Sequence, residues 1–160
     1  MGEYSGLEFY ERYHFADYKR SLKRGIGVCG DHSMILSEIL REKGIQNSIV
    51  AFDGHVVVEA NIEGSLWTLD PDFGVVIKSS FQSVKHQPGL IKSAYGGEGY
   101  SDSEIRALVS TYVNGHPKHF DGVRHFITKR YYFEQVSYYL IWLIPVLLIL
   151  LAIYIRNKAK

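Results

Sequence analysis

Three residue types that together can form an acyl intermediate occur in order along this 160-residue chain: Cys29, His55 and Asp70. A thiolate nucleophile needs a base beside it and a third group that orients this base. Cys29 follows Gly25 and Gly27 and opens a helical pattern, where a helix N-terminus favours negative charge. The two glycines would let a substrate backbone approach closely. His55 follows a tight turn, and Asp70 ends a strand pattern.

Each of these residues also has a structural interpretation. A lone cysteine at the start of a helix is usually a small packing residue, and an aspartate at the end of a strand is a common turn residue. Cys29 is the only cysteine, so the chain can form no intramolecular disulfide and no Cys-x-x-Cys zinc ribbon. The functional hypothesis therefore rests on the three residues together.

Four other histidines could take part in chemistry. His32 lies three residues after Cys29 and competes with His55 as the base, but two residues of one helix seldom meet in line. Three further histidines lack cysteine or carboxylate partners at ligand spacing: His116, His119 and His125. We therefore expect no metal site and no cofactor.

The elements that must position the triad follow from hydrophobic periodicity. Helical patterns cover residues 7–23 and 28–43, and Gly44 ends the second of them. Strand patterns then cover residues 45–52, 55–62, 66–70 and 73–77, and Asp53-Gly54 is a hairpin signal between the first two. Helices followed by an antiparallel sheet predict an α+β fold.

The region after the sheet is less regular. Residues 78–100 show no clear period and contain Gly-Gly-Glu-Gly, which predicts a mobile loop. A phosphate loop is excluded because no Gly-Lys-Ser/Thr follows. Ser101 and Glu104 form a capping box for a helix that reaches about residue 113. Residues 116–134 are aromatic and basic.

The C-terminal segment has the composition of a transmembrane helix. The 18 residues from Tyr138 to Ile155 are uncharged and almost wholly apolar. As a helix they would span roughly 27 Å, close to the hydrocarbon core of about 30 Å. We expect a single-pass helix at residues 135–156 in contact with the lipid bilayer, followed by a short basic tail at 157–160. The alternative is a buried core helix, which is rarely apolar on every face.

Charge limits the partners and the topology. The formal net charge is +1, and nothing in this balance indicates nucleic acid. Basic residues flank the apolar segment on both sides, so the positive-inside rule gives no orientation. The N-terminus as printed has no signal-peptide pattern. We expect a cytoplasmic domain if the chain is complete, and an extracytoplasmic one if a further span precedes it.

Three strings resemble one known family: GVCGDHSMILSEILREKGI, GHVVVEA and GSLWTLDPDFGVVI. Together they are similar to the transglutaminase-like superfamily of papain-like thiol enzymes, and the apolar tail resembles that of its bacterial membrane-anchored members. The resemblance covers residues 25–77. It implies that residues 1–134 form a domain in which a helix carrying the cysteine packs on a small antiparallel sheet.

The resemblance also implies an activity. Cys29 would attack an amide carbonyl to form a thioester, His55 would shuttle the proton, and Asp70 would orient His55. Further residues would flank the site or bind substrate: Gly27, Gly30, Glu59 and Trp67. The substrate would be a protein, a peptide or another amide-bearing molecule. Acyl transfer and hydrolysis both stay open, and the alternative is an inactive membrane-tethered scaffold or binding module that keeps the fold.

Overall fold

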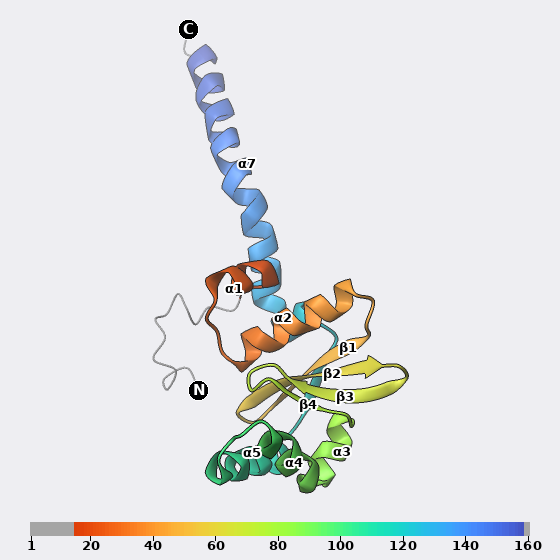
Figure 1. Ribbon diagram of the computed structural model, residues 1–160. Helices are drawn as coiled ribbons and strands as arrows, with labels where there is room; N and C mark the ends of the chain where they lie inside the picture. Colours follow the sequence, from red (N-terminus) through yellow and green to blue (C-terminus); the bar gives the residue numbers. More distant parts are fainter. Residues whose placement is uncertain (1–14, 159–160) are drawn as a thin grey trace.

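A computed structural model describes residues 15–158 of the chain, and it has three layers around one antiparallel sheet (Figure 1). The strands lie in the order β4-β3-β2-β1-β5. They are β1 (Asn47–Phe52), β2 (His55–Ile62), β3 (Ser65–Asp70), β4 (Val75–Ile77) and β5 (Lys118–Phe120). The helices are α1 (Tyr18–Arg24), α2 (Cys29–Glu42), α3 (Phe81–His86), α4 (Pro88–Gly97), α5 (Asp102–Asn114), α6 (Val123–Phe126) and α7 (Thr128–Lys158).

Tight turns set the register of the sheet. β1 and β2 form an antiparallel hairpin in which Phe52 pairs with His55. Gly54, in the turn between them, has φ of 91°, a conformation that favours glycine. The next turn places Glu63 and Gly64 at positive φ before β3. The expected α+β fold with a small antiparallel sheet is confirmed.

Alternation along the strands gives each face of the sheet its own core. Val57 of β2 is buried among side chains of α3, α4 and α5, whereas Val58 packs with side chains of α2. β1 shows the same alternation, because Val50 faces α3–α5 and Ile49 packs with Met34 of α2. The two faces are therefore covered by different helices, as Figure 1 shows.

The prediction of a mobile loop over residues 78–100 is wrong, because this region forms α3 and α4. Ser80 caps α3 by accepting a hydrogen bond from the backbone N–H of Ser83 at 3.2 Å. Pro88 begins α4, where its missing N–H costs nothing. Each helix buries only one or two large side chains, such as Phe81 and Tyr95, so its period in the sequence is short. The Gly-Gly pair lies at the end of α4.

The other predicted helices can be compared with the observed ones. The predicted second helix and the Ser101–Glu104 capping box are both present, as α2 and α5. Of the helix expected at residues 7–23, the part at 7–14 lies outside the described residues, and α1 covers most of the rest. β5, which pairs with β1, was not expected, because three residues give no period.

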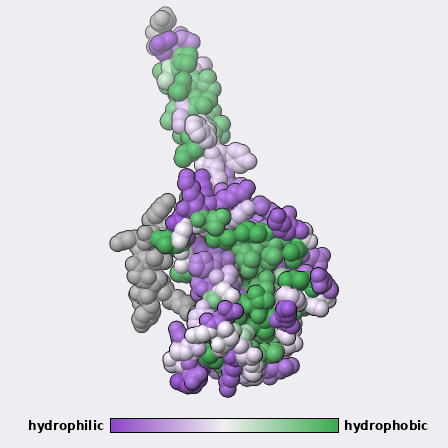
Figure 2. Space-filling model, in the orientation of Figure 1, coloured by the Kyte–Doolittle hydropathy of each residue, from purple (hydrophilic) through white to green (hydrophobic). Residues whose placement is uncertain are grey.

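α7 extends away from the body of the protein as one continuous helix of 31 residues (Figures 1 and 2). It begins ten residues before Tyr138, so the apolar segment continues a helix that starts on the domain. It is long and apolar enough to cross a membrane, and none of the described residues in its most apolar 18-residue window is buried. A buried core helix is therefore excluded for this segment of the structure.

Candidate active site

Cys29 is the first residue of α2 and is half-buried. The Asp31 carboxylate, two residues on, accepts a hydrogen bond from the backbone N–H of Val28 at 3.1 Å and so closes the start of the helix. Gly27 must be small here, because a Cβ on it would come within 2.7 Å of the Asp31 side chain. The backbone N–H of Cys29 lies in the first turn, where helical N–H groups have no acceptor within the helix. This N–H is therefore placed to donate to a substrate oxygen.

His55 begins β2 and is buried, with 6 % of its surface exposed. Its Nε2 lies 2.6 Å from Oδ2 of Asp70. The thiol of Cys29 also lies beside the ring, with Sγ within 4.8 Å of a ring nitrogen. Because Nε2 contacts Asp70, Nδ1 is the nitrogen that remains for the thiol. Phe52 and Phe73 pack edgewise against the imidazole, with ring centroids at 5.7 and 5.6 Å. The three residues singled out in the sequence thus meet in the order Cys-His-Asp.

The protonation of His55 follows from these contacts. Burial alone lowers the pKa of His55, but the hydrogen bonds with Asp70 and Cys29 outweigh burial and raise the pKa from 6.5 to about 9. At neutral pH the ring is therefore charged. A charged imidazole beside a thiol favours the thiolate, which is the nucleophilic form.

Asp70 is held by donors on both of its carboxylate oxygens. Its Oδ1 accepts from the backbone N–H groups of Asp72 at 3.1 Å and Phe73 at 3.3 Å. Its Oδ2 accepts from His55 and also from the hydroxyls of Tyr95 and Tyr112, the latter at 3.4 Å. Asp70 is 2 % exposed, so these donors replace the water that its carboxylate has lost.

Tyr95 and Tyr112 form a pair behind Asp70 that sequence reasoning missed. Their hydroxyl oxygens lie 3.0 Å apart, and neither residue has any exposed surface. Burial raises the pKa of both tyrosines well above 10, so both stay neutral donors. One signal was available: each tyrosine continues the apolar face of its helix, after Ile91 in α4 and after Leu108 in α5. That pattern indicates burial, but it does not show which polar group the hydroxyl meets.

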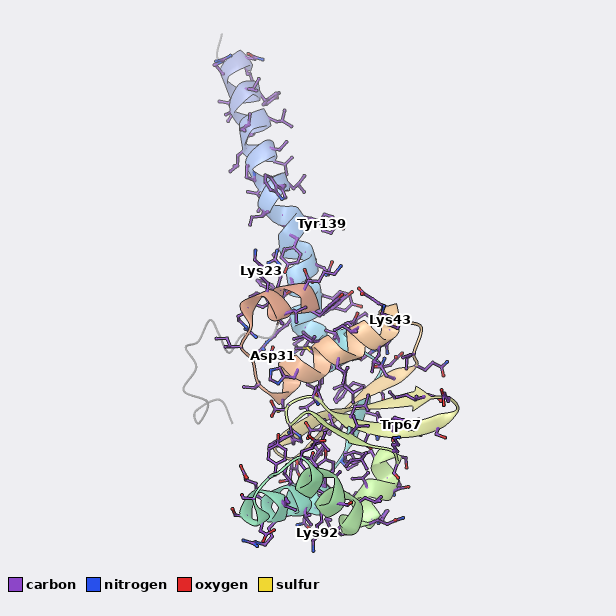
Figure 3. The ribbon with its side chains drawn as sticks, in the orientation of Figure 1. Lys23, Asp31, Lys43, Trp67, Lys92 and Tyr139 are labelled. Atoms are coloured by element: carbon purple, nitrogen blue, oxygen red, sulfur yellow. The ribbon has the colours of Figure 1, made fainter. Side chains whose placement is uncertain are left out.

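The other residues expected near the site have structural contacts. Gly30 is buried in the first turn of α2, next to Cys29. Glu59 lies on the same face of β2 as His55, and its carboxylate accepts from the N–H of Phe81 at 2.7 Å, which fixes the start of α3. Trp67 packs with the core cluster under α2. Figure 3 shows it at the end of the sheet away from Asp31 and hence from the start of α2.

A second His-Asp pair borders the thiol. His32 does not take the place of His55, because its Nδ1 contacts Oδ1 of Asp72 at 2.8 Å. The candidate metal-ligating atoms of Cys29, His55 and Asp72 all lie within 4.8 Å of one another, so these are residues that could hold an ion. His116 contacts Asp53 on the surface, at 2.9 Å.

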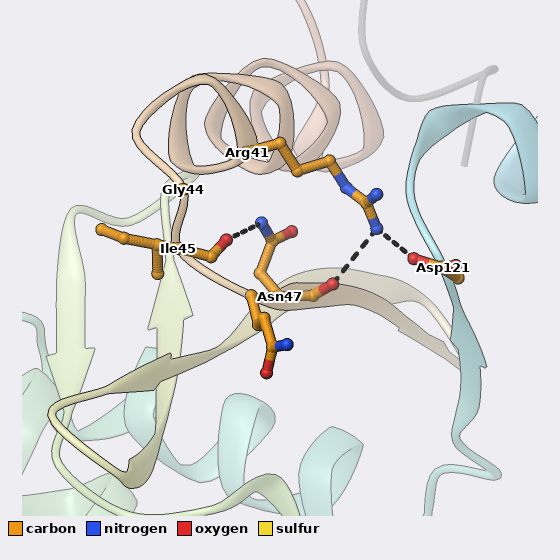
Figure 4. A pocket seen from close by; sticks show the side chains of 6 residues that line it. Arg41, Gly44, Ile45, Asn47 and Asp121 are labelled. Carbon is orange, nitrogen blue, oxygen red and sulfur yellow. Dashed lines mark hydrogen bonds and ion pairs between the residues drawn. The ribbon is translucent and has the colours of Figure 1, made fainter.

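A surface hollow of about 460 Å³ lies at the other end of α2 and is separate from the triad (Figure 4). Arg41 crosses it to pair with Asp121 and donates to the backbone oxygen of Asn47 at 3.3 Å. Asn47 in turn donates to the oxygen of Ile45 at 3.0 Å. The hollow thus has a polar lining that joins α2 to the start of β1, and none of its lining residues belongs to the triad.

Comparison with known proteins connects this geometry to a family. A family model described as a transglutaminase-like domain matches residues 5–90, a little over half of the chain. The matched segment contains all three residues of the triad and ends within α4, before Tyr95 and Tyr112. Neither the curated proteins nor the solved structures gave a match.

Proposed function

Because the chain belongs to the transglutaminase-like domain family, we propose that it is a thiol enzyme that cleaves or transfers an acyl group from an amide through a thioester on Cys29. The observation that carries the proposal is the position of His55, buried between the thiol of Cys29 and the carboxylate of Asp70. This buried imidazole lies beside the only thiol of the chain. It can therefore exchange a proton with the thiol, and the reaction needs no base from outside the protein.

In the proposed first step, the thiolate of Cys29 attacks the amide carbonyl carbon and the carbonyl oxygen becomes negative. The N–H of Cys29, at the start of α2, is placed to donate to that oxygen. His55 gives its Nδ1 proton to the amide nitrogen, and the C–N bond breaks as the amine leaves. The result is a thioester on Cys29 and a neutral His55.

In the second step, water or an amine attacks the thioester carbonyl. His55 takes a proton from the attacking group at Nδ1, and the C–S bond breaks to restore the thiolate and the imidazolium. Asp70 takes no part in the proton transfer of either step, because its carboxylate accepts five hydrogen bonds that hold it in place to orient the ring. Attack by water makes the chain a hydrolase, and attack by an amine makes it a transferase.

The proposal includes a membrane anchor. α7 carries an apolar stretch of bilayer length, and no residue of its most apolar 18-residue window is buried in the described structure. It would hold the active site close to the membrane surface. The substrates would then be amide-bearing proteins or peptides found at that surface. The anchor is independent of the chemistry, and the two are tested separately.

Alkylation of the only thiol tests the chemistry. We expect iodoacetamide to label the detergent-solubilised full chain readily at pH 7, and Cys29→Ser to abolish labelling. His55→Ala should slow labelling at least tenfold at pH 7, and Asp70→Asn should slow it less, because the ring is still present. His116→Ala is the matched control, since it removes an exposed histidine that also pairs with an aspartate, and it should change nothing. A labelling rate indifferent to His55→Ala, in protein that stays folded by circular dichroism, would favour the inactive scaffold.

A further inference from the structure

α1 presents basic and apolar side chains to the outside at the foot of α7. Its sequence, YKRSLKR, contains no acidic residue. Lys19, Arg20 and Lys23 are exposed, and between the cations Leu22 keeps 57 % of its surface exposed. Ile26, just after the helix, is 41 % exposed. A short helix with lysines around an exposed leucine has the composition of a segment that lies in a membrane interface.

Contacts with α7 fix the height of α1 along that helix. The backbone N–H of Ala16 donates to the buried carboxylate of Glu134 at 3.0 Å, and the hydroxyl of Tyr138 donates to the same oxygen at 3.0 Å. Arg20 stacks over the ring of Tyr138, 4.3 Å from its centroid. Tyr138 begins the apolar stretch of α7, so α1 lies at the level where α7 would enter a bilayer. Figure 3 shows Lys23 beside α7, close to the level of Tyr139.

The acidic groups near α1 leave both of its lysines available. Asp17 lies 3.9 Å from Arg20, and Glu42 of α2 accepts from the hydroxyl of Tyr18. Glu134 is buried under the helix. Neither Lys19 nor Lys23 forms an ion pair with a carboxylate in the described structure. Figure 2 shows hydrophilic surface gathered around the foot of α7.

We propose that α1 docks on the head groups of anionic lipids in the membrane that holds α7. This inference rests on the proposed anchor, which brings α1 within reach of the head groups. The phosphates of the anionic lipids would lie against Lys19 and Lys23, and Leu22 would enter the boundary between head groups and acyl chains. A bilayer is the occupant that fits, because it surrounds α7 at the height of Tyr138.

An ion pair connects α1 to the first turn of α2, the helix that carries Cys29. Arg24, the last residue of α1, turns inward and pairs with Asp31 at 3.2 Å, and both side chains are buried. Asp31 is the residue that closes the start of α2, just after Cys29. Lipid head groups that hold α1 in place would therefore also steady the first turn of α2.

Hydrogen exchange of the full chain in lipid nanodiscs tests the docking. One set of discs contains phosphatidylcholine alone, and the other contains one third phosphatidylglycerol. We expect the amides of residues 19–25 to exchange at least about fivefold more slowly in the anionic discs at low ionic strength. The double variant Lys19→Gln/Lys23→Gln should lose that difference. In 1 M salt, where charges are screened within about 3 Å, the wild type should lose it too.

The control is Lys92→Gln/Arg106→Gln, which removes the same charge from α4 and α5 on the side of the sheet away from α1 (Figure 3). It should keep the lipid difference. Equal exchange in the two kinds of disc would overturn the docking, and so would a difference that survives Lys19→Gln/Lys23→Gln. Co-elution of the chain with the discs reports the anchor separately. A chain that does not co-elute would overturn both proposals, and a chain that co-elutes with equal exchange would overturn the docking alone.

Discussion

The hydroxyl of Tyr95 donates a hydrogen bond to Oδ2 of Asp70, the oxygen that also contacts the imidazole of the triad. Tyr95 belongs to α4 and lies beyond residue 90, where the family match ends. The helices on the far face of the sheet are therefore part of the machinery that positions the triad. Without them, the buried carboxylate would lose the hydroxyl donors of Tyr95 and Tyr112.

Tyr95→Phe should weaken the hold on Asp70 without changing the shape of the core. A lost hydrogen bond to a buried charged group costs about 1.5–3 kcal/mol, so we expect the free energy of unfolding to fall by that amount. Labelling of Cys29 at pH 7 should slow by about threefold to tenfold, because the ring is less firmly oriented. Urea unfolding and iodoacetamide kinetics on the same preparation measure the two effects.

Tyr100→Phe is the matched control for that substitution. Its hydroxyl donates to the backbone oxygen of Phe73 at 2.7 Å and does not contact Asp70. Its loss should therefore lower stability slightly and leave the labelling rate unchanged. Equal labelling by both variants and the wild type would show that the tyrosine pair serves packing alone.

The raised pKa of His55 predicts how stability changes with pH. A histidine in the unfolded chain titrates near 6.5, whereas folding raises the pKa of His55 to about 9. The folded state holds this proton more tightly, so the contribution is complete below pH 6.5 and is lost as the pH rises through about 9. The rise corresponds to at most about 3 kcal/mol.

The measurement is best made on Cys29→Ser, which removes the titratable thiol beside the ring. Urea unfolding at pH 6 and at pH 9.5 should then show a loss of stability that comes chiefly from His55, smaller than the limit because one partner of the ring is gone. The loss should shrink further in Cys29→Ser/His55→Gln. A loss of the same size in both variants would mean that another group controls it.

Local signals predicted the parts of the fold that carry the triad. A clear helical period, a Gly after it and an Asp-Gly turn place Cys29 and His55 at the starts of their elements, and each of these signals acts within a few residues. The capping box of α5 was predicted for the same reason. The sequence did not predict α3, α4 and β5, because each is short and is held by partners distant in the sequence. The contacts of Tyr95 and Tyr112 with Asp70 are entirely of this kind.

Gly54→Val should destabilise the hairpin that presents His55. Gly54 has φ of 91°, which a β-branched residue adopts only with strain, so we expect a loss of about 1–3 kcal/mol. Since His55 is the next residue, labelling of Cys29 should slow as well. Gly89→Val is the control: that glycine has no positive φ and has open space around it, so stability should change little. Thermal unfolding of the two variants compares them directly, and equal midpoints would rule out strain at the turn.

If α7 is a membrane anchor, the chain up to Tyr138 should be soluble and the residues after it should hold the protein in the membrane. Full-length protein should stay with membranes through a carbonate wash, because α7 exposes apolar side chains along its whole span. A chain ending at Tyr138 keeps the hydrogen bond to Glu134 and the stacking of Arg20, so it should be soluble and folded, with normal labelling of Cys29. A chain ending at residue 133 also loses the Glu134 carboxylate, to which Ala16 donates, and should be less stable.

A charge at the centre of the span tests insertion directly. Leu148→Arg places such a charge there at a cost of about 3 kcal/mol and should reduce insertion, whereas Leu148→Ala should not. Release of the full-length chain by carbonate would contradict the anchor and leave the chemistry of Cys29 untouched.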